Sequence, residues 1–220
     1  MNTDIKAVIF DLDGTLLDTE KLLIKYWCKA ANDSGFPMTR EQALMLRSLT
    51  HKLVPELFHK WFGEDCDYKT LRALRMRLMS EHIERYGLEV KKGAKELLDF
   101  LGENGYRRAV ATATDVPRAS ELLKKAGLYD CFDSIISASM VEWGKPYPDI
   151  YIYAANRLGL ETGQCMAAED SPNGVVSASD AGCVTVMIPD LTEPDEELKK
   201  RCFAVCGDLT GIKELLMNGE

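Results

Sequence analysis

Apolar and polar residues follow two different patterns along this chain. Residues 5–10 form a short apolar run that is rich in β-branched and aromatic residues and ends at the polar sequence DLDGT, which predicts a buried strand. From about residue 90 onward, further apolar runs predict strands at 107–112, 134–137, 165–170, 183–188 and 203–209. Segments of helical period lie between them, at about 94–101, 117–126, 148–158, 172–182 and 210–217.

Residues 20–88 differ from the rest of the chain, because their apolar residues recur at helical spacing and no segment predicts a strand. Leu71 and Leu74 belong to one such helical face. Thr39 followed by Gln42 fits the capping box that starts a helix. This stretch is therefore predicted to be a wholly helical module.

The order of these patterns predicts the domain organisation. Strands that alternate with helices indicate right-handed crossovers and a parallel sheet covered on both faces. We expect an α/β fold in which residues 1–16 and 90–220 form a discontinuous Rossmann-like core, with a parallel sheet flanked by helices. Residues 17–89 would form an all-α cap inserted near the strand ends.

Composition and charge narrow the classes of partner. The chain has 220 residues, 46% of them hydrophobic, and a formal net charge of -8. An acidic surface repels a phosphate backbone, so nucleic acid is not an expected partner. No apolar stretch approaches the roughly 18 residues that span a bilayer, and no secretion signal is visible, so we expect no membrane association and a cytoplasmic location. The size is compatible with a monomer.

Polar residues that can carry chemistry lie at or near the predicted strand ends. They fall into four clusters along the sequence: Asp11 with Asp13, Thr112, Lys145, and Glu169 with Asp170. In open α/β sheets, ligands bind at the carboxyl ends of the strands. The predicted fold therefore brings all four clusters to one edge of the sheet.

The chemistry of these residues favours a metal-assisted phosphoryl transfer. Crowded carboxylates repel one another unless a cation joins them, and oxygen ligands without imidazole or thiolate favour Mg²⁺. A bound Mg²⁺ and the Lys145 ammonium would attract a phosphate group. Phosphoryl transfer needs mainly positioning and charge neutralisation, and a carboxylate can attack phosphorus to form an acyl-phosphate.

The sequence resembles a known family at these same positions. DLDGTLLDTE, the strand that ends in Thr112, GKPYPD and AAEDSPNG are similar to the four motifs of the haloacid dehalogenase-like hydrolase superfamily. Their spacing resembles the branch that contains β-phosphoglucomutase and small-metabolite phosphatases, whose members carry an α-helical cap. The resemblance covers nearly the whole chain and is weakest in residues 35–88.

The resemblance implies roles for the four carboxylates. Asp11 matches the nucleophile that becomes phosphorylated. Asp13 matches the general acid/base, with its backbone carbonyl on the metal. Asp170 matches the acidic metal ligand, and Glu169 a second ligand or an outer partner. The implied Mg²⁺ site is therefore formed by Asp11, Asp13, Glu169 and Asp170.

The resemblance also implies the residues that hold the phosphate and the substrate. Thr112 matches the phosphate-binding hydroxyl, with the Ala113 N–H beside it. Lys145 matches the lysine that bridges nucleophile and phosphate. Related caps use a polar or basic loop to hold the substrate, which makes Arg47 a candidate substrate contact. The implied substrate is a small phosphorylated metabolite, such as a sugar phosphate.

Other charged residues have simpler interpretations. Arg72, Arg75 and Arg77 are predicted to form a solvated helix face. Asp18 and Glu20 are interpreted as first-turn helix acids. The three histidines lack the spacing of metal ligands and are expected to be solvated or to cap helices: His51, His59 and His82.

Two activities remain open, with a phosphatase preferred to a sugar-phosphate mutase like β-phosphoglucomutase. The mutase carries a histidine in the first cap helix, where this chain has Leu23, and the loop Leu46–Thr50 also departs from the mutase pattern. Asp13 argues against a dehalogenase, which lacks the second aspartate. A catalytically silent binding protein would have lost at least one key site residue, and none is lost.

Overall fold

A single parallel sheet organises the part of the chain described by the computed structural model, residues 4–218. Within these residues six strands pair in the order β3-β2-β1-β4-β5-β6. The strands are β1 (Ala7–Phe10), β2 (Arg107–Thr112), β3 (Ser134–Ser137), β4 (Cys165–Glu169), β5 (Val184–Met187) and β6 (Ala204–Val205). The predicted α/β fold with a parallel sheet is confirmed.

The central strand β1 sets the register of the site. Phe10 is paired with Val110 of β2 on one side and with Ala168 of β4 on the other. The backbone N–H of Asp11 then donates to the carbonyl of Ala168 over 2.9 Å. Because the three strands are parallel and end together, the residues that follow them meet at one edge.

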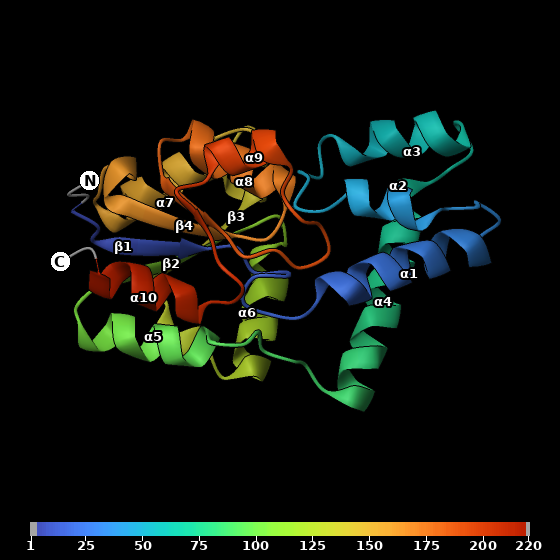
Figure 1. Ribbon diagram of the computed structural model, residues 1–220. Coiled ribbons are helices and arrows are strands. Elements are labelled where there is room, and N and C mark those ends of the chain that lie inside the picture. Colours follow the sequence, from blue (N-terminus) through green and yellow to red (C-terminus); the bar gives the residue numbers. More distant parts are fainter. Residues whose placement is uncertain (1–3, 219–220) are drawn as a thin grey trace.

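Helices cover both faces of the sheet (Figure 1). One face carries α5 (Ala94–Glu103), α6 (Val116–Ala126) and α10 (Thr210–Asn218). The other carries α7 (Asp149–Leu158), α8 (Pro172–Asp180) and α9 (Glu196–Arg201). Because side chains alternate along a strand, β1 supplies apolar residues to both layers and has no polar face.

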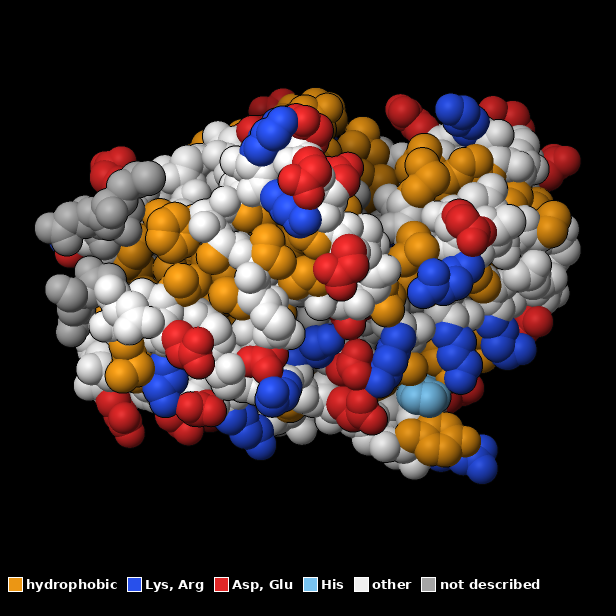
Figure 2. Space-filling model, in the orientation of Figure 1, with side chains coloured by type: hydrophobic (Ala, Val, Ile, Leu, Met, Phe, Trp, Pro, Cys, Tyr) orange, Lys and Arg blue, Asp and Glu red, His pale blue; other side chains and the backbone are white. Residues whose placement is uncertain are grey.

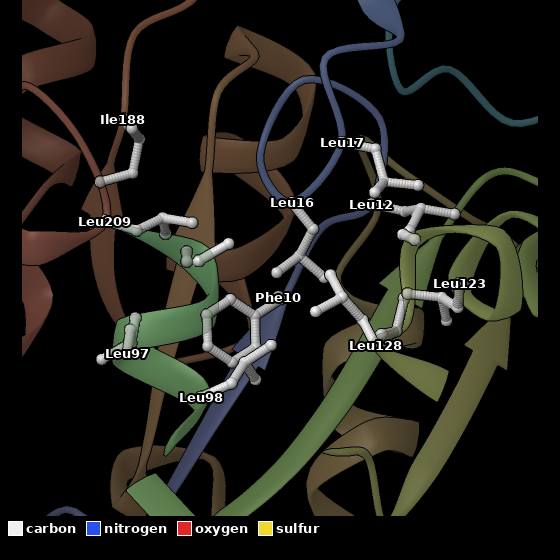
Figure 3. Close-up of a cluster of buried hydrophobic side chains, with 14 of the residues drawn as sticks. Phe10, Leu12, Leu16, Leu17, Leu97, Leu98, Leu123, Leu128, Ile188 and Leu209 are labelled. Carbon is white, nitrogen blue, oxygen red and sulfur yellow. The ribbon is translucent and has the colours of Figure 1, made fainter. Parts of the chain in front are cut away.

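Phe10 shows how one layer is filled (Figure 3). Its ring points into a cluster of buried leucines that includes Leu97 and Leu98 of α5 and Leu209 before α10. Leu12 and Leu16, which flank the loop after β1, belong to the same cluster. The loop that carries Asp11 and Asp13 is therefore anchored by apolar packing on both sides of the turn.

Four helices lie together beyond the carboxyl edge of the sheet (Figure 1). They are α1 (Glu20–Asp33), α2 (Arg40–Met45), α3 (Val54–Phe62) and α4 (Tyr68–Tyr86). They share a hydrophobic cluster in which the Phe58 ring lies 5.2 Å from the rings of both Trp27 and Tyr68. We propose that residues 17–89 form the cap, and residues 1–16 and 90–220 the core.

Two local expectations differ from the structure. The run 203–209 contributes only the two-residue edge strand β6, with Phe203 and Val205 exposed. Helix α9 was not predicted, because Leu198 is its single buried residue and leaves no apolar period. Its sequence signal lies elsewhere: the Asp195 side chain accepts a hydrogen bond from the Leu198 N–H, and acidic residues precede basic ones.

Among the helices of residues 4–218, none has both the length and the apolar character that crossing a membrane requires. Acidic and basic side chains are interspersed on the face shown in Figure 2. This face therefore offers no large region of one charge sign.

The capping box predicted at Thr39 gives a first testable effect. The Gln42 N–H donates to Thr39 Oγ1 over 3.2 Å, and the Thr39 N–H donates to the Gln42 side chain over 2.8 Å. Thr39→Ala should lower the free energy of unfolding by about 1 kcal/mol, measured by urea denaturation. Thr39→Ser keeps the hydroxyl and should lose less than half of that; equal losses would contradict the capping role.

Candidate active site

The loop after β1 is packed against the loop after β4. Gly14 has φ +95°, and a Cβ at this position would lie 2.5 Å from Oδ2 of Asp170. Only glycine therefore combines this backbone conformation with such a close approach. The Thr15 hydroxyl donates to the other carboxylate oxygen of Asp170 over 3.2 Å. The turn that the sequence motif predicted thus brings Asp11 and Asp170 together.

Lys145 is fully buried and connects three elements. Its ammonium contacts the carboxylates of Asp11 and Glu169 and donates to the carbonyl of Ala111 over 2.9 Å. Burial opposes the charged form, but the two carboxylates outweigh it and raise the pKa of Lys145. All three N–H groups of the ammonium are used, so the side chain is held in one position.

Glu169 lies at the end of β4 in a confined space. One of its carboxylate oxygens contacts Lys145 and accepts a hydrogen bond from the Tyr151 hydroxyl. The other oxygen faces the backbone of Gly174, where a Cβ would come within 1.9 Å of it. That second oxygen is buried and has no hydrogen-bond partner among the described residues. The sequence reasoning missed Tyr151, because its position in α7 reads as an ordinary core position.

Three carboxylates form a cluster that fits a metal ion. One oxygen from each of Asp11, Glu169 and Asp170 lies within 4.8 Å of the others, and all three residues are buried. Oδ2 of Asp11, like Oε2 of Glu169, has no hydrogen-bond partner among residues 4–218. Buried acceptors without donors are costly, and an all-oxygen set suits a hard divalent cation. The residues present therefore fit a divalent metal site.

Burial also raises the pKa values of this cluster. It raises the pKa of Asp11 well above the usual range, and Lys145 only partly offsets the effect. It raises the pKa of Asp170 to about 7, opposed by the nearby Arg47 guanidinium. A cation between these groups would favour their ionised forms. Without one, burial favours the protonated forms of Asp11 and Asp170.

Asp13 stands apart from the carboxylate cluster. Its two oxygens accept hydrogen bonds from the hydroxyls of Thr19, over 2.6 Å, and Thr114, over 2.8 Å. The Thr114 N–H in turn donates to Oγ1 of Thr112 over 3.0 Å. The side chain of Asp13 is thus free of the metal cluster, so the predicted contact with the metal would use its backbone carbonyl. Thr19 and Thr114 were not singled out from the sequence, where they read as ordinary loop residues.

Arg47 connects the cap to the core. Its buried guanidinium contacts the carboxylate of Asp170, donates to Oγ1 of Thr192 over 2.8 Å, and lies 3.6 Å from Glu20. Asn173 of α8 donates to the Arg47 carbonyl over 2.9 Å. Arg47 therefore borders the carboxylate cluster, and a substrate contact for it stays a prediction.

A cavity of about 600 Å³, partly open to solvent, lies between these loops and the four helices α1–α4. The core lines it with the predicted site residues Asp11, Asp13, Thr112 and Ala113, and with Thr114. Lys145, Glu169 and Asp170 lie behind this wall: Lys145 contacts Asp11 and Glu169, and Asp170 contacts Arg47.

Three expectations from the sequence are wrong for cap residues that line the cavity, which together form what we call the cap wall. Glu20, interpreted as an ordinary helix acid, is buried and lines the cavity, and burial raises its pKa. His51 is half-buried and lines the cavity, so it is not a solvated histidine. Arg72 and Arg75 face the space between cap and core, and Arg77 alone of the three is well exposed.

Comparisons with known proteins agree with this architecture. The family profile described as haloacid dehalogenase-like hydrolase matches residues 5–182. Protein CbbY (plasmid) of Cupriavidus necator is 34% identical over 199 residues, which cover 84% of this chain and 78% of that protein. Hexitol phosphatase A of Escherichia coli K12 is 33% identical over 201 residues, covering 86% and 88%.

A solved structure supports the fold. The crystal structure of β-phosphoglucomutase from Clostridium difficile superimposes with a TM-score of 0.82, at 20% identity, and covers 98% of this chain and 96% of that one. The likeness extends over the cap helices as well as the sheet. Together with the family profile and the two relatives, it shows that the chain belongs to the haloacid dehalogenase-like hydrolase family.

Proposed function

We propose that this protein is a Mg²⁺-dependent phosphatase that hydrolyses a small phosphorylated metabolite through a phosphorylated Asp11. The observation that carries the proposal is the position of Asp11. Its carboxylate lines the cavity, one of its oxygens is held by Lys145, and the other has no hydrogen-bond partner among residues 4–218. The names of similar proteins, such as hexitol phosphatase A, support the same class of reaction.

The reaction would take place in two displacements. The Asp11 carboxylate attacks phosphorus, the bond from phosphorus to the ester oxygen breaks, and Asp13 donates a proton to the leaving oxygen. Water then attacks phosphorus, Asp13 takes its proton, and the bond to the Asp11 carboxylate breaks to release phosphate. The hydroxyls of Thr19 and Thr114 fix the Asp13 carboxylate for both proton transfers.

Charge is the second requirement of phosphoryl transfer. Mg²⁺ held by Asp11, Glu169 and Asp170, with the backbone carbonyl of Asp13, would neutralise charge on the transferred group. The Lys145 ammonium adds a fixed positive charge beside the nucleophile. The hydroxyl of Thr112 and the N–H of Ala113, which also line the cavity, would hold phosphate oxygens.

A sugar-phosphate mutase is the alternative, and the cavity disfavours it. Leu23, at the place where the mutase carries a histidine, lines the cavity with an apolar side chain. Leu46 and Leu49 of the loop that departs from the mutase pattern also line it. The chain thus lacks, at these positions, the polar residues that the mutase pattern places there.

The proposal is tested by a phosphate-release assay across small phosphorylated metabolites, with Mg²⁺ present. Steady release from at least one metabolite is expected. Interconversion of hexose 1-phosphate and hexose 6-phosphate without net release would instead indicate the mutase. No reaction with any compound would contradict both activities.

Metal removal gives a prediction that does not depend on the substrate. EDTA should abolish phosphate release, and Mg²⁺ should restore it. Mg²⁺ at 100 times its dissociation constant should also stabilise the metal-free protein by about 2.7 kcal/mol, because it binds only the folded state. Thermal unfolding measures this shift, and Asp170→Asn should reduce it. An unchanged melting temperature with Mg²⁺ would contradict a metal site at these carboxylates.

A further inference from the structure

Helix α4 presents a row of side chains to the space between cap and core. Arg72, Arg75, Met76 and Met79 stand at positions i, i+3, i+4 and i+7 and line a second hollow of about 350 Å³. Such spacing places them on one face of the helix. Arg75 also lines the main cavity, together with Asp11 and Asp13. The two hollows therefore meet at Arg75.

Arg75 carries a charge that no neighbouring carboxylate pairs. Its guanidinium carbon lies 4.8 Å from the ring centroid of Trp27. Its Nε is buried without a hydrogen-bond partner, and the side chain forms no ion pair with any residue in the range 4–218. An aromatic face holds a guanidinium in position without neutralising it. Arg75 is thus fixed, partly desolvated and unpaired.

The neighbouring arginines, unlike Arg75, each form an ion pair with a carboxylate. Arg72 is 2.6 Å from Asp115, and Arg118 is 2.8 Å from Glu121. Burial, together with Arg72 and Arg118, lowers the pKa of Arg75 to about 10, and Tyr68 and the Asp13 carboxylate offset this only in part, so Arg75 is still charged at neutral pH. An anion beside Arg75 would offset both the cost of burying its charge and the repulsion from the neighbouring arginines.

His51 does not add a second charge here. Its Nε2 lies 3.4 Å from Nη2 of Arg72, which can only donate, so this ring nitrogen is the acceptor. Burial and the nearby Arg72 charge lower the pKa of His51. A neutral His51 leaves Arg75 as the one unpaired cation on this part of the described cap wall.

The cap side of the main cavity combines apolar and polar side chains. The apolar ones are Leu23, Ile24, Trp27, Ala43, Leu46, Leu49 and Val54, and the polar or charged ones are Glu20, Arg47, Ser48, His51, Tyr68 and Arg75. Of its two arginines, Arg47 is paired with Asp170, whereas Arg75 forms no ion pair within residues 4–218. Arg75 is therefore the arginine of this lining that is available to an anionic group of a ligand.

We propose that Arg75 binds a second anionic group of the substrate, so that the preferred substrates are compact phosphate monoesters with a carboxylate or second phosphate at the far end. This inference rests on the proposed phosphatase function. The transferred phosphate lies at Asp11, and the second anion meets the guanidinium of Arg75 across the same cavity. Carboxylate and phosphate share the chemistry that a guanidinium fork recognises.

Matched substrates test the inference on the unmodified protein. In the carboxylate comparison, 3-phosphoglycerate is set against glycerol 3-phosphate. In the phosphate comparison, the bisphosphate of propanediol is set against its monophosphate. We expect a higher kcat/KM for the member that carries the second anionic group in at least one pair, and the pair that shows it identifies which anion is recognised. Equal kcat/KM values within both pairs would overturn the inference.

A variant then assigns the preference to Arg75. Arg75→Gln should reduce the ratio of the two kcat/KM values by about 10- to 150-fold, the usual range for losing a charged hydrogen bond. Arg75→Lys keeps the charge and should retain part of the preference. Arg77→Gln, on the exposed side of the same helix, should leave the ratio unchanged.

The outcomes separate this inference from the function on which it rests. If no compound releases phosphate, the proposed function fails. If release occurs and Arg75→Gln lowers both kcat/KM values of a pair equally, the function stands and the inference fails, because Arg75 would then act on the transferred group or on the fold. A thermal unfolding curve for each variant identifies a loss of folding, and the wild-type comparison remains decisive in that case.

Discussion

Asp11→Asn should lower kcat for phosphate release by about 10³-fold or more, because an amide is a far poorer nucleophile than a carboxylate. Asn has nearly the shape of Asp, and the surrounding apolar packing of Phe10 and Leu12 is untouched. The variant should therefore stay folded and keep its cavity. Initial rates under saturating substrate and Mg²⁺ measure the effect.

Asp18→Asn is the matched control for this experiment. Asp18 lies shortly after the same motif, but it is partly exposed and pairs with Lys21. Its substitution should change kcat by less than a factor of about three, as expected for a surface pair. Near-normal turnover in Asp11→Asn would show that another group attacks phosphorus.

Lys145→Met should destabilise the metal-free protein by about 3–5 kcal/mol and nearly abolish turnover. The methionine would leave the carboxylates of Asp11 and Glu169 buried without their cation, and the Ala111 carbonyl without its donor. Urea denaturation in EDTA measures the loss of stability. Phosphate release with Mg²⁺ measures the loss of turnover.

The control for Lys145 is an ion pair of the same kind at the surface. Lys29 lies 2.8 Å from Asp33, with about half of each side chain exposed. Lys29→Met should cost less than about 1 kcal/mol. If Lys145→Met were no more destabilising than Lys29→Met, the buried ammonium would not be holding the carboxylates together.

The sequence was sufficient for the parts of the site that belong to the sheet. Strand ends are marked by a change from apolar to polar residues, and parallel strands bring those ends together. Asp11, Thr112 and Glu169 were therefore predicted at one edge, and the register of β1, β2 and β4 places them there. Gly14 follows Asp13 in the same motif, and its φ of +95° forms the tight turn there.

The cap was harder to interpret, because a charged residue facing a cavity has the same spacing as one facing solvent. Arg75 and Arg77 are two positions apart on α4, and only the packing of α4 on α1 and the core distinguishes them. Glu20 was similarly ambiguous: it begins α1, as a first-turn acid should, yet the turn at Gly14 places it against Arg47. These assignments depend on tertiary contacts that no local pattern contains.

Buried polar residues were missed for the opposite reason. Tyr151 lies between apolar residues of α7, where a tyrosine is a normal core residue. Its hydroxyl donates a hydrogen bond to Glu169, the last residue of β4. Thr19 and Thr114 are far apart in the sequence, yet both donate hydrogen bonds to the Asp13 carboxylate. Only the folded arrangement reveals such partners.

The central claim is that Asp11 becomes phosphorylated, and chemical trapping tests it most directly. The enzyme is mixed with substrate and Mg²⁺, quenched during turnover and treated with borohydride, which reduces an acyl-phosphate to an alcohol. Peptide mass spectrometry should then find homoserine at position 11, and only when substrate was present. Homoserine at another aspartate, or an unmodified Asp11 in a sample quenched while phosphate was being released, would contradict the account.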